Sequence, residues 1–149
     1  MKNMKKIISF VAIIFALSSA TFAQENEGHE KIKVPSAVQT ALKQKYPEAK
    51  NVGWEKENGN YEANWGGKSR EDNSVQFTPS GNFIEIVKAI PASQLPQNVI
   101  TYINQHYKGT KITEAGKVTD AKGTTSYEAE VKGKDVIFDE HGNFVKAEK

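Results

Sequence analysis

The sequence contains no cysteine, so a disulfide bond, a thiol nucleophile and a lipid anchor on cysteine are all excluded. Histidine is also scarce, and His29, His106 and His141 do not lie at the spacing of a helical zinc motif. The Gly-x-Ser-x-Gly elbow of serine hydrolases is absent as well. We therefore expect no bound metal, no cofactor and no enzymatic activity, and a fold that depends on a packed core.

Two short segments look like ligand sites but are better explained as turns. Gly67-Lys68-Ser69 lacks the earlier glycine that a phosphate-binding loop requires, because Glu62 stands at that position. The segment 139–143 carries oxygen ligands of the kind that calcium binds, but its counterpart at 78–82 does not. What the two segments share is a turn sequence, so a turn is the prediction for both.

The first 23 residues, Met1 to Ala23, have the pattern of a secretory signal peptide. A basic start precedes an apolar run, Ile7 to Leu17, and small residues follow it. This run is too short to span a membrane, because a membrane-spanning helix needs about 20 apolar residues. We expect cleavage after Ala23, or alternatively after Ala20, no stable membrane insertion afterwards, and a periplasmic or secreted protein.

Removal of this segment reverses the sign of the net charge. The whole chain has 20 basic and 18 acidic residues and a formal net charge of +2. Lys2, Lys5 and Lys6 belong to the signal, which contains no acidic residue, so the mature chain has a slight excess of acidic charge. Nucleic-acid-binding proteins carry clustered positive charge, and we therefore expect no nucleic-acid partner.

The rest of the chain contains one pattern twice. Val34-Pro35 returns as Leu95-Pro96, and the segment 77–83 returns as 138–144 at the same interval, with Phe, Gly, Asn and Phe at equivalent positions. Repetition at a fixed interval indicates two copies of one structural unit. The predicted segments are a signal peptide (1–23), a flexible tail (24–33), a first repeat (34–89) and a second repeat (90–149).

Each repeat opens with a predicted amphipathic helix. Apolar residues recur at helical spacing and form one stripe. The stripe contains Val38, Leu42 and Tyr46 in the first repeat and Val99, Ile103 and Tyr107 in the second. Pro35 and Pro96 stand at the start, where a helix tolerates proline because that N–H has no intrahelical acceptor.

Strands are predicted for the rest of each repeat. Asn58-Gly59 is a strong signal for a two-residue hairpin, because that turn requires positive φ at both residues. Gly81 and Gly142 each close a predicted turn in a left-handed conformation. The expected fold class is α+β, with two tandem repeats, each a helix packed on a four-stranded antiparallel meander sheet.

These motifs together resemble the PepSY-like family, also called beta-lactamase-inhibitor-like. The resemblance covers nearly all of residues 34–146 and is carried by the two helix openings, the helix exit at 46–49, the Tyr-Glu-Ala strands and the paired Phe-x-x-x-Gly-Asn-Phe hairpins. It implies a secreted or periplasmic protein built of tandem repeats. In the inhibitor that gives the family its name, the open sheet face grips an enzyme. This chain lacks that inhibitor's disulfides and no inhibitory loop can be matched, so beta-lactamase inhibition is not transferred.

The sheet faces away from the helices are predicted to be polar and solvated. Their residues are Glu62, Asn64, Gln76, Glu128, Glu130 and Asp139. A broad polar face suits a protein or peptide partner better than an enclosed small molecule. The expected function is therefore an exported, monomeric, non-catalytic binding module with inhibitor-like character. A binder of a small ligand or envelope component, with a pocket between sheet and helix, is the alternative, and an unrecognised hydrolase ranks last.

The candidate partner-binding residues are Trp54, Glu62, Asn64, Lys68 and Arg70. Tryptophan and arginine are enriched at binding hot spots. Trp54 has no tryptophan at the equivalent place in the second repeat, and the loop 66–73, which carries Lys68 and Arg70, is longer than its counterpart. Trp65 lies on the apolar side of its strand and is predicted to be a core residue.

Overall fold

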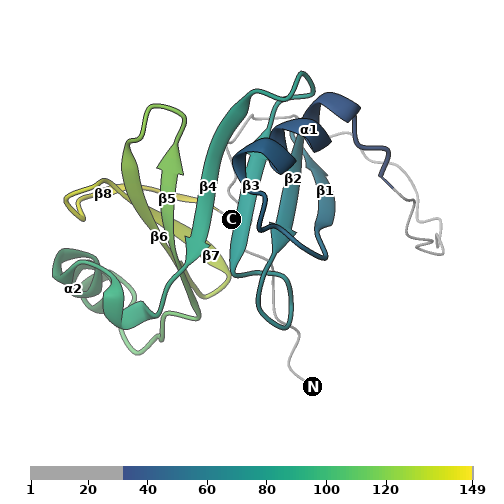
Figure 1. Cartoon of the computed structure of the whole chain (residues 1–149). Coiled ribbons are helices and arrows are strands. Elements are labelled where there is room, and N and C mark those ends of the chain that lie inside the picture. Colours follow the sequence, from purple (N-terminus) through teal and green to yellow (C-terminus); the bar gives the residue numbers. More distant parts are fainter. Residues whose placement is uncertain (1–31, 149) are drawn as a thin grey trace, which may run out of the picture.

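A computed structural model describes residues 32–148 (Figure 1). The predicted signal peptide and most of the predicted tail lie outside these residues. In chain order the elements are α1 (Ser36–Lys45), β1 (Gly53–Glu57), β2 (Asn60–Trp65), β3 (Asn73–Phe77), β4 (Phe83–Ala89), the 3₁₀ turn η1 (Ala92–Gln94), α2 (Gln97–His106), β5 (Glu114–Asp120), β6 (Thr125–Val131), β7 (Lys134–Phe138) and β8 (Phe144–Glu148).

All the strands belong to one antiparallel sheet of eight strands, in the order β1 to β8. The expected α+β class and the helix-plus-meander order are therefore present, but the two separate four-stranded sheets were a wrong prediction. β4 and β5 pair from Glu85↔Asp120 to Ala89↔Gly116 and join the two halves. This pairing satisfies backbone N–H and C=O groups that two free edge strands would leave exposed.

Both helices lie on the same side of the sheet. Each covers its own group of strands and forms its own core cluster, α1 over β1–β4 and α2 over β5–β8 (Figure 1). Ile86, which faces α1, is paired with Thr119, and Thr119 points to the same side as Ala115 beneath α2. We call this side the helix side and the opposite side the helix-free face.

The predicted helix stripes form the centres of the two cores. Val38 and Val99 are completely enclosed, and Leu42 and Ile103 are buried beside them. Trp65 is 5% exposed and its ring lies 5.4 Å from that of Tyr46, so the prediction that Trp65 is a core residue is confirmed. Burial of these apolar side chains is the main stabilising contribution to each half.

The predicted turns are confirmed by their backbone angles. Asn58 and Gly59 have φ values of 49° and 83°, as a type I′ hairpin requires. Gly81 and Gly142 have φ values of 84° and 79°. The carboxylate of Asp139 accepts hydrogen bonds from the backbone N–H groups of His141 and Asn143, at 2.9 and 2.8 Å. Asp139 therefore belongs to this turn, and the prediction that it lies on the polar sheet face was wrong.

Candidate functional site

Charge is sorted between the two sides of the sheet. The alternation of side chains along each strand and the register between strands place every acidic residue of the eight strands on the helix-free face. These residues are Glu55, Glu57, Glu62, Glu85, Glu114, Asp120, Glu128, Glu130, Asp135 and Glu148.

The lysines of the strands have the opposite distribution. On the helix side lie Lys56, Lys88, Lys117 and Lys134, all exposed. Lys146 is the one strand lysine of the described residues that lies on the helix-free face, and its Nζ is 2.6 Å from Oε1 of Glu148. The acidic side chains of the strands are therefore concentrated on the helix-free face, although the whole chain has a formal net charge of +2.

Glu128 is the most deeply buried of these acids. It lies on β6 between its ladder partners Gly116 and Ile137, and 2% of its surface is exposed. Neither carboxyl oxygen has a hydrogen-bond partner among the described residues. Burial, followed by the charges of Asp135 and Glu85, raises the pKa of Glu128 to about 8. The carboxyl group is therefore mostly protonated at neutral pH.

A second group of acids lies on β1 and β2. Glu62 is 6% exposed and accepts a hydrogen bond from the hydroxyl of Ser74, and burial raises its pKa. The Nε2 of Gln76 donates to Oε2 of Glu57 at 3.0 Å. Burial and then Glu62 raise the pKa of Glu57 to about 7. Mutual repulsion and desolvation thus disfavour full ionisation at this end of the face as well.

A third group lies where β5, β6 and β7 adjoin. Burial and the charges of Glu130 and Glu71 raise the pKa of Glu114 to about 7. The pKa of Asp135 rises to about 6, first through burial and then through Glu130 and Glu148. Asp135 and Glu114 in turn raise the pKa of Glu128, as does Glu62 from the first half, so the acids of both halves form one continuous acidic surface.

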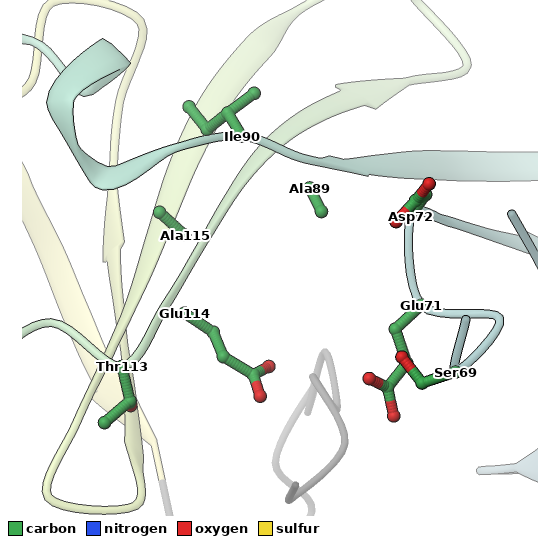
Figure 2. Close-up of a pocket in the computed structure, with 8 residues that line it drawn as sticks. All are labelled: Ser69, Glu71, Asp72, Ala89, Ile90, Thr113, Glu114 and Ala115. Carbon is green, nitrogen blue, oxygen red and sulfur yellow. The ribbon is translucent and has the colours of Figure 1, made fainter. Parts of the chain in front are cut away.

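A pocket of about 380 Å³ lies at one end of this surface, between the loop joining β2 to β3 and the adjacent segments of β4 and β5. Figure 2 shows Glu71 from the loop and Glu114 from β5 with their carboxyl groups directed toward each other across the opening. Ala89 and Ile90 line another side. Both halves of the chain contribute to this pocket, and its polar side chains are predominantly acidic.

A further pocket of about 370 Å³ lies between α2 and the turn before β8. Tyr102 and Phe144 line it, with their rings stacked at 4.8 Å and 8° apart in orientation. Phe144 is 42% exposed. The residue equivalent to Tyr102 in the first repeat is Ala41, so this aromatic pair belongs to the second repeat alone.

The structure separates the five candidate contacts that the sequence suggested. Glu62 and Asn64 lie on the helix-free face. A Cβ built on Gly53, which lies beside Asn64, would be 3.6 Å from Nη1 of Arg70, so this arginine reaches the same face. Lys68 is exposed in the loop.

Trp54 is the candidate on the other side of the sheet. It is paired with Ala63 and packs against the core cluster beneath α1. It therefore does not share a face with Glu62.

The helix-free face is less solvated than its sequence pattern predicts. Glu62 and Glu128 were expected to be solvated and are buried. Glu57, Glu114 and Asp135 also belong to this surface and were not among the predicted residues. The signal available was the spacing of the acids at every second residue of a strand, with a lysine between them in Glu55-Lys56-Glu57 and an apolar residue between them in Glu128-Ala129-Glu130.

Comparison with known proteins finds one matching family model. A family model described as beta-lactamase-inhibitor-like and PepSY-like matches residues 29–67 and 66–146. No curated protein sequence matches the chain. Among the described residues, no helix has the length and apolar character that a membrane-spanning helix needs.

Several solved structures have a similar fold. A protein from Bacteroides fragilis named BLIP-like is 26% identical, with a TM-score of 0.61 and coverage of 79% of this chain and 88% of that one. A Bacteroides eggerthii protein, whose name proposes a periplasmic location, has a TM-score of 0.67 at 18% identity and covers 78% and 88%. A DUF2874 family protein from Bacteroides uniformis has a TM-score of 0.65 at 22% identity and covers 76% and 87%.

Proposed function

Since the chain belongs to the beta-lactamase-inhibitor-like, PepSY-like family, we propose that it is a non-catalytic binding module that holds a protein or peptide on its helix-free face. The observation that carries the proposal is the sorting of charge, with the strand acids on one side of the sheet and most strand lysines on the other. A sheet stabilised only by its core would need no such separation. A face that spans both halves offers the extended area that protein interfaces use.

Acid–base catalysis is the less favoured use of these carboxyl groups. A catalytic pair needs two groups whose pKa values are moved in opposite directions, one to give and one to accept a proton. On this face the pKa values of Glu57, Glu114 and Glu128 all rise. The carboxyl groups are also distributed over the strands instead of converging on one bond. Carboxyl groups spread over several strands can contact an extended partner, whereas hydrolysis needs them close to a single bond.

Two adjacent residues test which side of the sheet binds. Ser126 is paired with Val118 on the helix-free face, whereas Thr125 is paired with Thr119 on the helix side, and both are half-buried. A photo-crosslinking amino acid is introduced at each position and the cells are irradiated. We expect a discrete protein adduct from position 126 and none from position 125. Adducts from position 125 alone would contradict the proposal.

A location outside the cytoplasm is the second part of the proposal. The support is the signal-like segment ending at Ala23 and the periplasmic location proposed for a structural neighbour. The intact mass of the protein recovered from the periplasm or medium should lack residues 1–23, or 1–20 if cleavage follows Ala20. Retention of the whole segment in that fraction would contradict it.

A small-ligand function is the second candidate, and the pocket beside α2 favours it. The stacked rings of Tyr102 and Phe144 suit a flat or apolar ligand. Phe144→Ala opens this pocket without touching the helix-free face. Loss of an envelope-derived small molecule from Phe144→Ala, with unchanged crosslinking at Ser126, would support this function in place of the first.

A further inference from the structure

Glu128 combines burial with unused hydrogen-bonding capacity on the helix-free face. Its side chain points to the same side as those of its neighbours on the ladder, and both of its oxygens are without a partner in the described part of the chain. An unpartnered buried carboxyl group costs free energy, because its desolvation is not compensated. A partner that supplies hydrogen-bond donors at this position would recover that cost.

The residue opposite makes room for the side chain of Glu128 itself. Gly116 is the ladder partner of Glu128, and a Cβ built there would lie 3.2 Å from Cγ of Glu128 and 2.7 Å from Cγ1 of Val87. Any larger residue would therefore push against the glutamate side chain. The glycine allows the glutamate to lie flat over β5, next to the strand that joins the two halves.

The surroundings of Glu128 determine the charge of the group that fits. Electrostatic repulsion reaches it from acids on four other strands. The residues responsible are Glu62 on β2, Glu85 on β4, Glu114 on β5 and Asp135 on β7. Lys146 on β8 is engaged with Glu148. The acids on β2, β4, β5 and β7 therefore attract a cationic group and repel an anion.

We infer that the partner held on the helix-free face presents a lysine or arginine side chain to Glu128. This side chain belongs to a basic segment of the partner, whose other basic residues lie over the surrounding acids. This inference rests on the proposed function and specifies the chemistry of the partner. An ammonium or guanidinium group supplies several N–H donors and a full positive charge. The donors would pair with the carboxyl oxygens of Glu128, and the charge would offset the repulsion among the acids. A bare metal ion fits less well, because the described residues contain no group of side chains arranged to hold one.

Binding of this kind has a protonation signature. Burial and the neighbouring acids keep the pKa of Glu128 at about 8 in the free protein. A cation in contact lowers that pKa, so binding releases a proton. Affinity for a basic partner should therefore increase as the pH rises from about 6 to about 8, beyond the gain expected from the other acids.

Calorimetric titration of the purified protein with a hexalysine peptide tests the inference, with a hexaglutamate peptide as the charge control. Glu128→Gln removes the charge and keeps the shape. Glu140→Gln is the matched control, because Glu140 is exposed in the turn between β7 and β8 and the net charge changes equally. We expect Glu128→Gln to weaken hexalysine binding by about tenfold or more. We expect Glu140→Gln to change it by less than about threefold.

The release of protons supplies an independent readout. Titrations in buffers of different ionisation enthalpy should show proton release with the natural protein and a smaller release with Glu128→Gln. If circular dichroism shows that Glu128→Gln is unfolded, Glu114→Gln takes its place, with an expected loss of affinity of about fivefold, which exceeds the change expected for Glu140→Gln. Equal affinity of Glu128→Gln and Glu140→Gln for hexalysine would overturn the inference.

Two further outcomes separate this inference from the proposed function. Spermine that binds as tightly as hexalysine would identify the site as one for a free polyamine and would overturn the assignment to a protein side chain. If crosslinking at Ser126 persists unchanged in Glu128→Gln, the helix-free face still binds the partner, but Glu128 does not contribute to that binding. Loss of crosslinking in Glu128→Gln, together with weaker hexalysine binding, would support both.

Discussion

Gly116 and Glu128 lie directly opposite each other on β5 and β6, and the glutamate side chain occupies the space that a side chain at 116 would need. The backbone of Gly116 does not have a positive φ, so its conformation alone does not require glycine. The requirement comes from the close approach of Glu128 and Val87. This position therefore couples the packing of the sheet to the placement of the buried acid.

The first prediction compares two glycines of the same face. Gly116→Ala should destabilise the fold by about 1–3 kcal/mol, because the added methyl group forces Val87 or Glu128 to move. Gly53→Ala is the control, since the atoms nearest to a Cβ there lie 3.6 Å or more away. Gly53→Ala should change stability by less than about 0.5 kcal/mol. Chemical denaturation measures both, and equal losses would show that the space above Gly116 is not limiting.

The second prediction concerns stability against pH. The folded-state pKa values of Glu128, Glu57 and Glu114 lie above the ordinary value for glutamate, so the folded protein binds more protons than the unfolded chain. Stability from this source is present below the unfolded pKa and is lost as the pH rises through the folded pKa. Glu128, the most buried of the three, should account for most of the effect, because solvent screens the half-buried Glu57 and Glu114. We expect the free energy of unfolding to fall by at least about 3 kcal/mol between pH 5 and pH 8.

Glu128→Gln identifies the main source of that decline. The glutamine is neutral at every pH, so the variant should be more stable than the natural protein at pH 8 and should show a flatter profile between pH 5 and pH 8. Urea denaturation at a series of pH values measures the difference. A variant profile parallel to that of the natural protein would assign the decline to the other acids.

The third prediction uses three turns of the same form. Gly81 and Gly123 both have positive φ and donate their N–H to a carbonyl three residues earlier, as does Gly142. A Cβ at Gly123 meets nothing within 4 Å, whereas one at Gly81 would lie 2.7 Å from the carbonyl oxygen of Ala37 in α1. Gly123→Ala should cost about 1–2 kcal/mol from backbone strain alone.

Gly81→Ala should cost about 1 kcal/mol more than Gly123→Ala, because the clash with α1 adds to the strain. Gly142→Ala should lie between the two, since the nearest atoms there are side-chain atoms at 3.2 Å that can shift. Thermal unfolding of the three variants gives the order. A larger loss at Gly123 than at Gly81 would mean that the helix does not restrict the turn.

The fourth prediction tests the two cores separately. Leu42→Ala and Ile103→Ala remove equivalent residues that are 6% and 1% exposed. Each should cost about 2–5 kcal/mol, and the completely packed Ile103 should lie toward the upper end. Denaturant midpoints measure both losses. An unchanged midpoint for either variant would mean that its helix does not pack on the sheet.

Local patterns predicted the units of this fold well, because each unit is specified by residues close together in sequence. The spacing of Val38 and Leu42 defines a helix face, and Asn58-Gly59 defines a hairpin, without reference to the rest of the chain. The repetition of both patterns then predicted two copies. The covering of each meander by its own helix follows from the need to bury one apolar face.

The joining of the two sheets could not be predicted in this way. Whether Glu85 pairs with Asp120 depends on how one complete half docks against the other, and no local pattern records that. The burial of Glu128 also depends on the docking of the two halves, because its ladder partner Gly116 is itself paired with Ala89 of the first half. Its alternation with apolar residues predicted a position facing solvent, and only the tertiary arrangement encloses it.

The ladder between β4 and β5 also determines how the molecule can deform. A hinge between the halves would have to break the backbone pairing from Glu85↔Asp120 to Ala89↔Gly116. Hinge motions of the kind seen between two linked domains are therefore costly in this molecule. The proposed partner would then meet an acidic surface whose curvature does not change on binding. Association would cost little conformational entropy, and selectivity would depend on how well the shape of each basic partner matches that surface.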